Sequence, residues 1–111
     1  SAASDVYKRQ LQQSIDRLLS DNDTIFREIL SNIPERQKEV LYAIAKDGEA
    51  RQVTSSAFIK RHRLASASAV QSAIKKLLDK DFITEINKTY SLTDRLFALW
   101  IKTVYGTGFR L

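Results

Sequence analysis

The apolar pattern between Ser66 and Leu78 is the feature of this sequence that most restricts its fold. Apolar residues recur there every three or four positions, as on one face of an α-helix, at Val70, Ala73, Ile74, Leu77 and Leu78. Ser66 predicts the helix start, because its hydroxyl can accept a hydrogen bond from a free N–H group of the first turn. The opposite side is small, polar and partly basic, and it carries Ser68, Gln71, Ser72 and Lys75. We therefore expect one side of this helix in the core and the other in solvent.

A shorter helix is predicted just before it. Ser55 or Ser56 can cap this first helix, and Phe58 and Ile59 would face inward. A tight turn through Leu64–Ala65 then leads to Ser66. Two helices joined in this way form a helix-turn-helix, in which the second helix can lie in the major groove of DNA.

A β-hairpin is predicted after the second helix. Residues 82–86 and 89–92 are rich in β-branched and aromatic residues, and Asn87-Lys88 occupies the two-residue turn between them. The segment Glu49–Val53 is short and extended, and could form the first edge of the same sheet. The order helix, turn, helix and hairpin predicts a mainly α fold with a small β-hairpin, a winged helix-turn-helix.

Two helices are predicted at the beginning of the chain. The first is indicated by apolar residues on one side of residues 11–19, namely Leu11, Ile15, Leu18 and Leu19. The sequence of residues 20–23 should break it, and Asn22 or Asp23 can cap the second helix. The apolar face of this second helix is expected from Ile25, Phe26, Ile29, Leu30 and Ile33.

Pro34 marks the start of the predicted winged unit, residues 34–104. Proline fits the first turn of a helix, which here would run to Lys46, bury Val40, Leu41 and Ile44, and end before Gly48. Asp94 is expected to begin the last helix. Its wide apolar surface would consist of Leu96, Phe97, Leu99, Trp100 and Ile101, with Trp100 packed inside. Residues 105–111 hold two glycines and are predicted to be an irregular tail.

Residues 1–10 resemble the translation of a transposase-based sequencing adapter, whose mosaic end reads as Asp5-Val6-Tyr7-Lys8-Arg9-Gln10. We therefore expect a non-native leader, with native sequence from about Leu11. These residues carry no functional argument here. They can still be helical, because they adjoin a helical segment.

Positive charge is concentrated in the second half of the chain. Residues 1–50 hold 7 Lys and Arg against 9 Asp and Glu, whereas residues 51–111 hold 11 against 4. Such an excess favours contact with phosphates, although it is also common on proteins that never meet DNA. The candidate nucleic-acid contacts are Lys60, Arg61, Arg63, Ser66, Ser68, Gln71, Ser72, Lys75 and Lys88.

The basic run Lys60–Arg63 has two interpretations. It could contact phosphates beside the second helix, or it could simply complement the dipole at a helix C-terminus. His62, within this run, is the only histidine, and we expect it to face solvent rather than to serve a catalytic or metal site.

Catalytic and metal-binding motifs are missing from the sequence. It has no cysteine, one histidine and no glycine-rich phosphate loop, so we expect no enzyme activity, no metal and no cofactor in this chain itself. It also has no apolar run of about 18 residues. We therefore expect no membrane partner and a cytoplasmic location.

Three segments together resemble the C-terminal part of prokaryotic, archaeal-type P-loop ATPases of the AAA+/STAND group. These are residues 34–45, residues 66–78, and Tyr90-Ser91-Leu92-Thr93-Asp94 followed by Phe97-Ala98-Leu99-Trp100-Ile101. The resemblance spans Leu11 to Lys102. It implies that residues 11–33 are a remnant of the helical ATPase lid, ahead of a winged helix. It also implies that the parent protein binds ATP and Mg²⁺ through Walker motifs, which lie upstream in that family.

Three functions remain open from the sequence. The chain could be the winged-helix module of an ATPase, with a regulatory role or with DNA, a partner protein or its own ATPase domain as the partner. It could instead be a free-standing dimeric winged-helix DNA-binding transcription regulator, or a winged helix that binds only protein. Gln71 is the one strong base-reading residue on the second helix, since Ala67, Ser68 and Ala69 lead it. This composition argues against tight sequence-specific binding.

Overall fold

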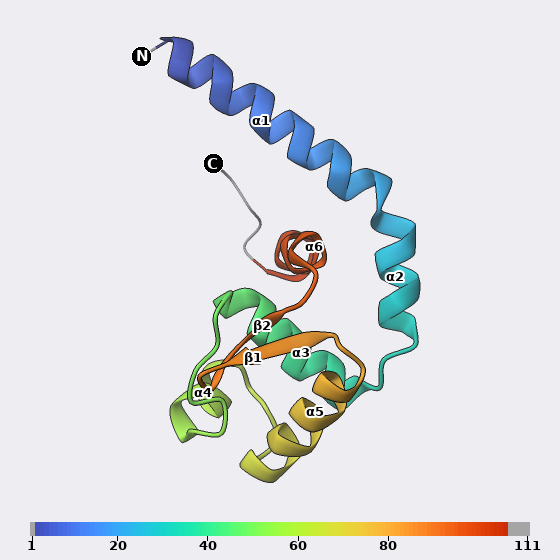
Figure 1. Cartoon of the computed structure of the whole chain (residues 1–111), viewed down its shortest axis with the longest axis vertical. Helices are drawn as coiled ribbons and strands as arrows, with labels where there is room; N and C mark the ends of the chain where they lie inside the picture. The colour runs from blue at the N-terminus through green and yellow to red at the C-terminus, as the bar shows by residue number, and fades with distance from the viewer. Residues whose placement is uncertain (1, 107–111) are drawn as a thin grey trace.

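The computed structural model describes residues 2–106, which form an elongated molecule with a projecting N-terminal helix (Figure 1). The elements in chain order are α1 (Ala2–Asp21), α2 (Asp23–Ser31), α3 (Glu35–Asp47), α4 (Ser56–Arg61), α5 (Ala67–Asp79), β1 (Ile83–Ile86), β2 (Thr89–Leu92) and α6 (Arg95–Tyr105). The chain is thus mainly helical with one antiparallel hairpin, as predicted. None of the helices in this range is both long enough and apolar enough to cross a bilayer.

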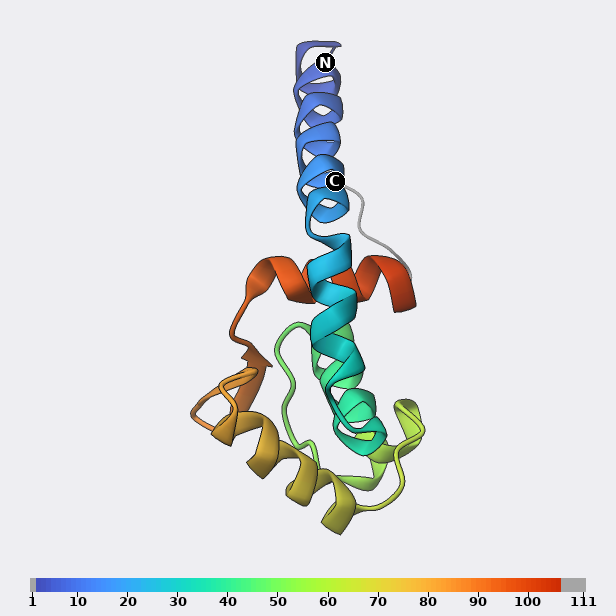
Figure 2. The ribbon, with the colours of Figure 1, turned by 90° about the vertical axis from the view of Figure 1, so that its right-hand side faces the viewer.

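Helix α3 is the centre of the core. It packs against α5, α6 and β2, so the other elements of the winged unit surround it (Figures 1 and 2). Leu41 and Ile44 of α3 are fully buried, as are Leu77 of α5 and Ile101 of α6. The apolar spacing in these three helices therefore places their stripes against one another, which is where the hydrophobic effect stabilises them.

Both helices of the helix-turn-helix begin at serine caps. The Ser55 hydroxyl accepts a hydrogen bond of 3.2 Å from the N–H of Phe58. The Ser66 hydroxyl accepts one of the same length from the N–H of Ala69. Ser55 rather than Ser56 is therefore the cap of α4, and the predicted start of α5 is confirmed.

The hairpin register follows from its turn. Ile86 pairs with Thr89 and Ile83 with Leu92, which leaves Asn87 and Lys88 as the two turn residues. Both have positive φ, 50° and 59°, as the type I′ turn of a two-residue hairpin requires. β1 begins at Ile83, one residue later than predicted.

A third short edge completes the sheet. Ala50 pairs with Tyr90 through two backbone hydrogen bonds of 2.8 Å, one in each direction. The extended segment predicted at residues 49–53 thus joins the sheet, although only as a single bridge beside β2.

The leading helices differ in part from the prediction. α1 is continuous to Asp21, so the break lies at Asn22 and residues 2–10 share the helix. One part of the expected apolar side of α1 and α2 is buried as predicted, at Leu19, Phe26, Leu30 and Ile33. Another part is exposed to solvent: Leu11 is 37%, Leu18 51% and Ile25 55% exposed. The reason is that α1 extends away from the body, as Figure 2 shows, and therefore has little to pack against.

A hydrogen bond fastens α2 to α6. Trp100 is only 1% exposed, and its Nε1 donates to the Asp23 Oδ1 over 2.9 Å. The Asp23 Oδ2 accepts from Arg27 Nε at the same distance, and the Arg27 guanidinium lies 5.4 Å from the centre of the Trp100 ring. The bond from Arg27, and then that from Trp100, lowers the pKa of the Asp23 carboxyl. Asp23 therefore serves this tertiary contact, and neither it nor Asn22 makes the predicted side-chain cap.

The last helix is longer than predicted. α6 includes Tyr105, which was expected to begin an irregular tail, and the Tyr105 ring stacks on Tyr42 with 4.9 Å between centroids. Gly106 caps the helix, and its N–H donates to the Lys102 carbonyl oxygen over 3.0 Å. A Cβ at this position would lie 2.7 Å from that oxygen, so a side chain would be crowded there. The rest of the expected tail, residues 107–111, lies outside the described residues.

Replacing Lys88 with glycine should stabilise the domain. The left-handed conformation costs an L-residue roughly 1–2 kcal/mol, whereas the extra chain entropy of glycine costs roughly 0.5–1 kcal/mol. We expect Lys88→Gly to raise the free energy of unfolding by about 0.5 kcal/mol, measured by urea denaturation. Asp81→Gly, at φ 61° outside the hairpin, is the matched control and should behave alike. A destabilised Lys88→Gly with a stabilised Asp81→Gly would show that the Lys88 side chain supports the fold.

Candidate nucleic-acid interface

Helix α5 has the two sides that its sequence predicts. Val70, Ile74 and Leu77 are 1%, 6% and 0% exposed, and they hold the helix against the core. On the other side, the predicted contacts Ser68, Gln71, Ser72 and Lys75 are all exposed. Ser66 and Ser68 lie together at the start of the helix, with 3.3 Å between their hydroxyl oxygens. The polar side thus forms a continuous strip along a firmly anchored helix.

Uncompensated positive charge surrounds this strip. Lys60, Arg63, Lys75 and Lys88 are exposed and form no ion pair with any other residue of the range 2–106. Arg63 occupies the turn just before α5, with φ 55°, and Lys88 occupies the tip of the hairpin. Cations with no internal partner are free to contact phosphates.

Arg61 is not free in this way. Its Nη2 lies 2.5 Å from the Asp47 Oδ2, at the end of α3, and its guanidinium lies 5.6 Å from the centre of the Phe58 ring. The basic run therefore divides into one cation that ties α4 to α3 and two, Lys60 and Arg63, that point to no acidic partner in the described chain.

The His62 side chain is largely covered, and the expectation that it faces solvent is wrong. Its side chain is 8% exposed, its Nε2 lies 3.0 Å from the Asp47 Oδ1, and its ring packs 4.6 Å from that of Phe58. Its position directly after the last residue of α4 turns it toward Asp47, which the sequence pattern did not reveal. Burial lowers the pKa of His62, and the Asp47 carboxylate opposes that effect only in part.

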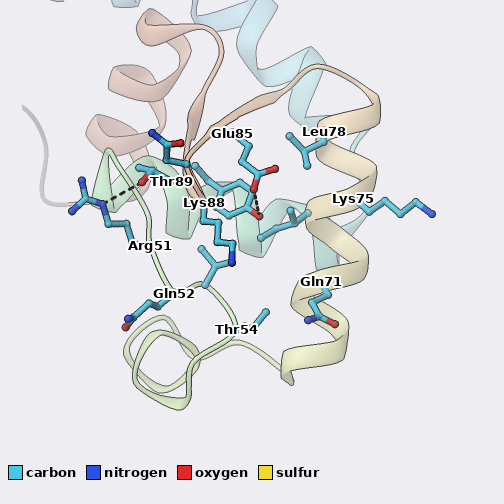
Figure 3. Close-up of a pocket in the computed structure, with 13 residues that line it drawn as sticks. Arg51, Gln52, Thr54, Gln71, Lys75, Leu78, Glu85, Lys88 and Thr89 are labelled. Atoms are coloured by element: carbon cyan, nitrogen blue, oxygen red, sulfur yellow. Dashed lines mark hydrogen bonds between the residues drawn. The ribbon is translucent and has the colours of Figure 1, made fainter.

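A cleft separates the hairpin from α5. It has a volume of about 920 Å³, and its walls are α5, the hairpin and the segment of residues 51–54 (Figure 3). Lys88 reaches from the hairpin toward the loop that carries Gln52 and Thr54, whereas Lys75 points away from the cleft. The cleft thus brings Gln71, Lys75 and Lys88 to one face of the molecule, while Lys60 does not line it.

Arg51 and Gln52 belong to this face but are missing from the predicted contacts. Both are exposed, Arg51 Nε donates to the Thr89 hydroxyl over 3.2 Å, and Gln52 has a positive φ of 49°. The segment of residues 49–53 joins the sheet only at Ala50, so it has no periodicity that would indicate which side chains face outward. Their position just before the helix-turn-helix was the one available signal.

The described residues offer no alternative site for metal chemistry. Residues 2–106 contain no group of three His, Cys, Asp or Glu side chains placed to hold a metal ion. Their one histidine, His62, lies 3.0 Å from the Asp47 carboxylate.

Comparison with protein families gives one match. The matching family is described as "Probable winged helix domain", and the match covers residues 24–103, from α2 to α6. Comparisons with curated proteins and with solved structures gave no match.

Acidification should destabilise the domain through His62. Its folded-state pKa lies below the ordinary value, so the unfolded chain takes up the proton more readily. The stability that neutral His62 provides is present above pH of about 6.5 and is lost as the pH falls below it. We expect the free energy of unfolding to fall between pH 7.5 and 5.5, and to fall less in His62→Gln. Equal slopes for the two proteins would contradict this role.

Proposed function

Because this chain belongs to the probable winged helix domain family, we propose that it is a DNA-binding module that places α5 in the major groove. The observation that carries the proposal is the polar side of α5. Its residues are exposed on a helix whose other side is fixed in the core. Arg63 just before the strip and Lys75 within it form no ion pair with another residue of the range 2–106.

Three cations are placed so that they could contact the phosphates of both strands of a duplex. Arg63 lies beside the N-terminal end of α5, Lys75 lies two turns along the helix, and Lys88 lies across the cleft on the hairpin. With α5 in the groove, Arg63 and Lys75 would face its phosphate walls, and Lys88 would reach the adjacent backbone. Phosphate contacts of this kind give affinity and orientation without reading sequence.

Base reading would be limited. Gln71 is the side chain on the strip with a paired donor and acceptor for adenine, while Ser66, Ser68 and Ser72 each offer one hydroxyl. We therefore propose moderate affinity with weak sequence preference. The same face could bind an acidic protein instead, and the salt dependence described next distinguishes the two, because only DNA releases condensed counterions.

Removing three of these cations should weaken DNA binding and its salt dependence together. For Arg63→Ala/Lys75→Ala/Lys88→Gly we expect the slope of log affinity against log salt to become shallower by about 2–3, since each phosphate contact contributes about 0.9. The matched control, Lys8→Ala/Arg9→Ala/Arg17→Ala, removes the same charge from α1 at the far end of the molecule (Figure 1). Fluorescence anisotropy on a 20-base-pair duplex measures both. Equal slopes for the two variants would refute the proposed face.

We further propose that this module belongs to a larger P-loop ATPase of the AAA+/STAND group, whose upstream domain binds ATP and Mg²⁺. The resemblance around Tyr90–Asp94 and Phe97–Ile101 motivates this placement. The contact between Asp23 and Trp100 supports it, because it makes α2 part of the same unit as α6 and leaves the face of α5 open. The ATPase domain would then join at α1, away from the DNA contacts.

The reading frame upstream of the Leu11 codon tests this placement. We expect a Walker A motif of the form Gly-x-x-x-x-Gly-Lys-Ser/Thr within the native gene. A start codon near Leu11 with no such motif would refute it and would favour the free-standing dimeric regulator. Light scattering of the chain would then be expected to show a dimer, because half-site recognition uses two copies.

A further inference from the structure

The cleft between α5 and the hairpin has an apolar floor that DNA contact does not explain. Val53 and Ile74 are each 6% exposed and form its base, and the partly buried Leu78 and Tyr90 extend it. Duplex DNA presents phosphates and base edges to a protein, so it would contact the rim and leave this floor unfilled. The volume of about 920 Å³ falls within the range of small-molecule sites, about 300–1,000 Å³.

One polar side chain crosses above this floor. Lys88 extends over the cleft toward the loop of Gln52 and Thr54, whereas the Gln52 amide points outward (Figure 3). Gln52 and Lys88 both project from left-handed backbone positions, where glycine would be less strained. The hairpin turn accounts for the positive φ of Lys88 and fixes the direction in which its side chain leaves the backbone.

Lys88 is the cation that an anion in the cleft would meet. The lining also includes Arg51, Lys75 and the acid Glu85, but the Arg51 Nη2 lies 3.9 Å from the Glu49 Oε2 and Lys75 points away from the cleft. The Glu85 Oε2 accepts a hydrogen bond of 3.2 Å from the Tyr90 hydroxyl, which partly satisfies it. Among the three cations, Lys88 is the one directed over the opening, and it has no ion-pair partner in residues 2–106.

We propose that this cleft binds a small amphipathic anion, with its apolar body against Val53, Ile74 and Leu78 and its anionic head beneath Lys88. Bound ligand would occupy Lys88 and cover Gln71. The proposed function assigns the same two residues to DNA contact. If that assignment holds, the ligand and DNA cannot bind at the same time.

The probe for the test is 8-anilinonaphthalene-1-sulfonate, an aromatic body with one anionic head. Titrated into the ¹⁵N-labelled protein without DNA, it should shift the amide resonances of Gln52, Gln71, Lys88 and Tyr90. The exposed leucines of α1, Leu11 and Leu18, offer a competing apolar surface. Shifts confined to α1 would overturn the proposal.

Variants distinguish a specific contact between Lys88 and the anionic head from a nonspecific effect of the protein's positive charge. Lys88→Gly relieves a left-handed residue, so the fold should persist, and it should weaken binding of the anionic probe by about threefold to fivefold. Gln52→Gly relieves the same strain at the rim, where the side chain points outward, and should change probe binding by less than about twofold. Lys76→Ala, an exposed cation of α5 that does not line the cleft, should change it by less than about twofold. The neutral probe N-phenyl-1-naphthylamine should bind Lys88→Gly as it binds the parent protein. Equal losses for both probes would overturn the assignment of Lys88 to the anionic head.

A DNA-binding measurement in the presence of the probe tests the ligand site separately from the proposed function. With probe at saturation, the apparent DNA affinity should fall at least about tenfold. Probe bound in the cleft with no DNA binding at any salt concentration would refute the DNA-binding proposal and leave the ligand site standing. DNA binding that depends on Arg63 and Lys75, with no probe shifts in the cleft, would refute the ligand site alone. Simultaneous binding of both would overturn their competition.

Discussion

The packing of α5 against α3 is the constraint on which the rest of this structure depends. Leu41 and Ile44 of α3 and Leu77 of α5 are completely buried, so α5 can neither rotate nor slide without opening the core. Fixing one side of the helix fixes the other, because residues three and four apart share a face. The exposed side chains Ser68, Gln71 and Lys75 owe their common direction to that buried contact. A surface built in this way can meet a partner with little loss of backbone entropy.

Features of the fold that depend on neighbouring residues could be predicted from the sequence. The stripe from Val70 to Leu77, the serine cap at Ser66 and the turn at Asn87-Lys88 each depend on neighbouring residues only, and all were predicted correctly. Where a distant residue decided, prediction failed. The His62 side chain lies against Asp47 of another helix, and the Asp23 carboxylate, in the first residue of α2, accepts a hydrogen bond from Trp100 of α6. No periodicity records such partners.

Exposure of the leading helices illustrates the same limit. The apolar spacing predicted both leading helices correctly. It could not show that Leu11 and Leu18 of α1 and Ile25 of α2 are left exposed within the described residues. The candidate site was likewise predictable only along α5. Arg51 and Gln52 reach the same face through a single bridge between Ala50 and Tyr90, which is tertiary pairing that lacks a repeating signature. Residues on regular elements were found, and those on the connecting segment were missed.

The bond between Asp23 and Trp100 gives the molecule a mechanical linkage. α6 follows β2 after only Thr93 and Asp94, and the Asp94 carboxylate holds the first turn of α6 through the N–H groups of Leu96 and Phe97. The hairpin, α6 and α2 are therefore coupled in series. A torque applied to α1 and α2 would be transmitted along α6 to the base of the hairpin, and with it to the position of Lys88 relative to α5.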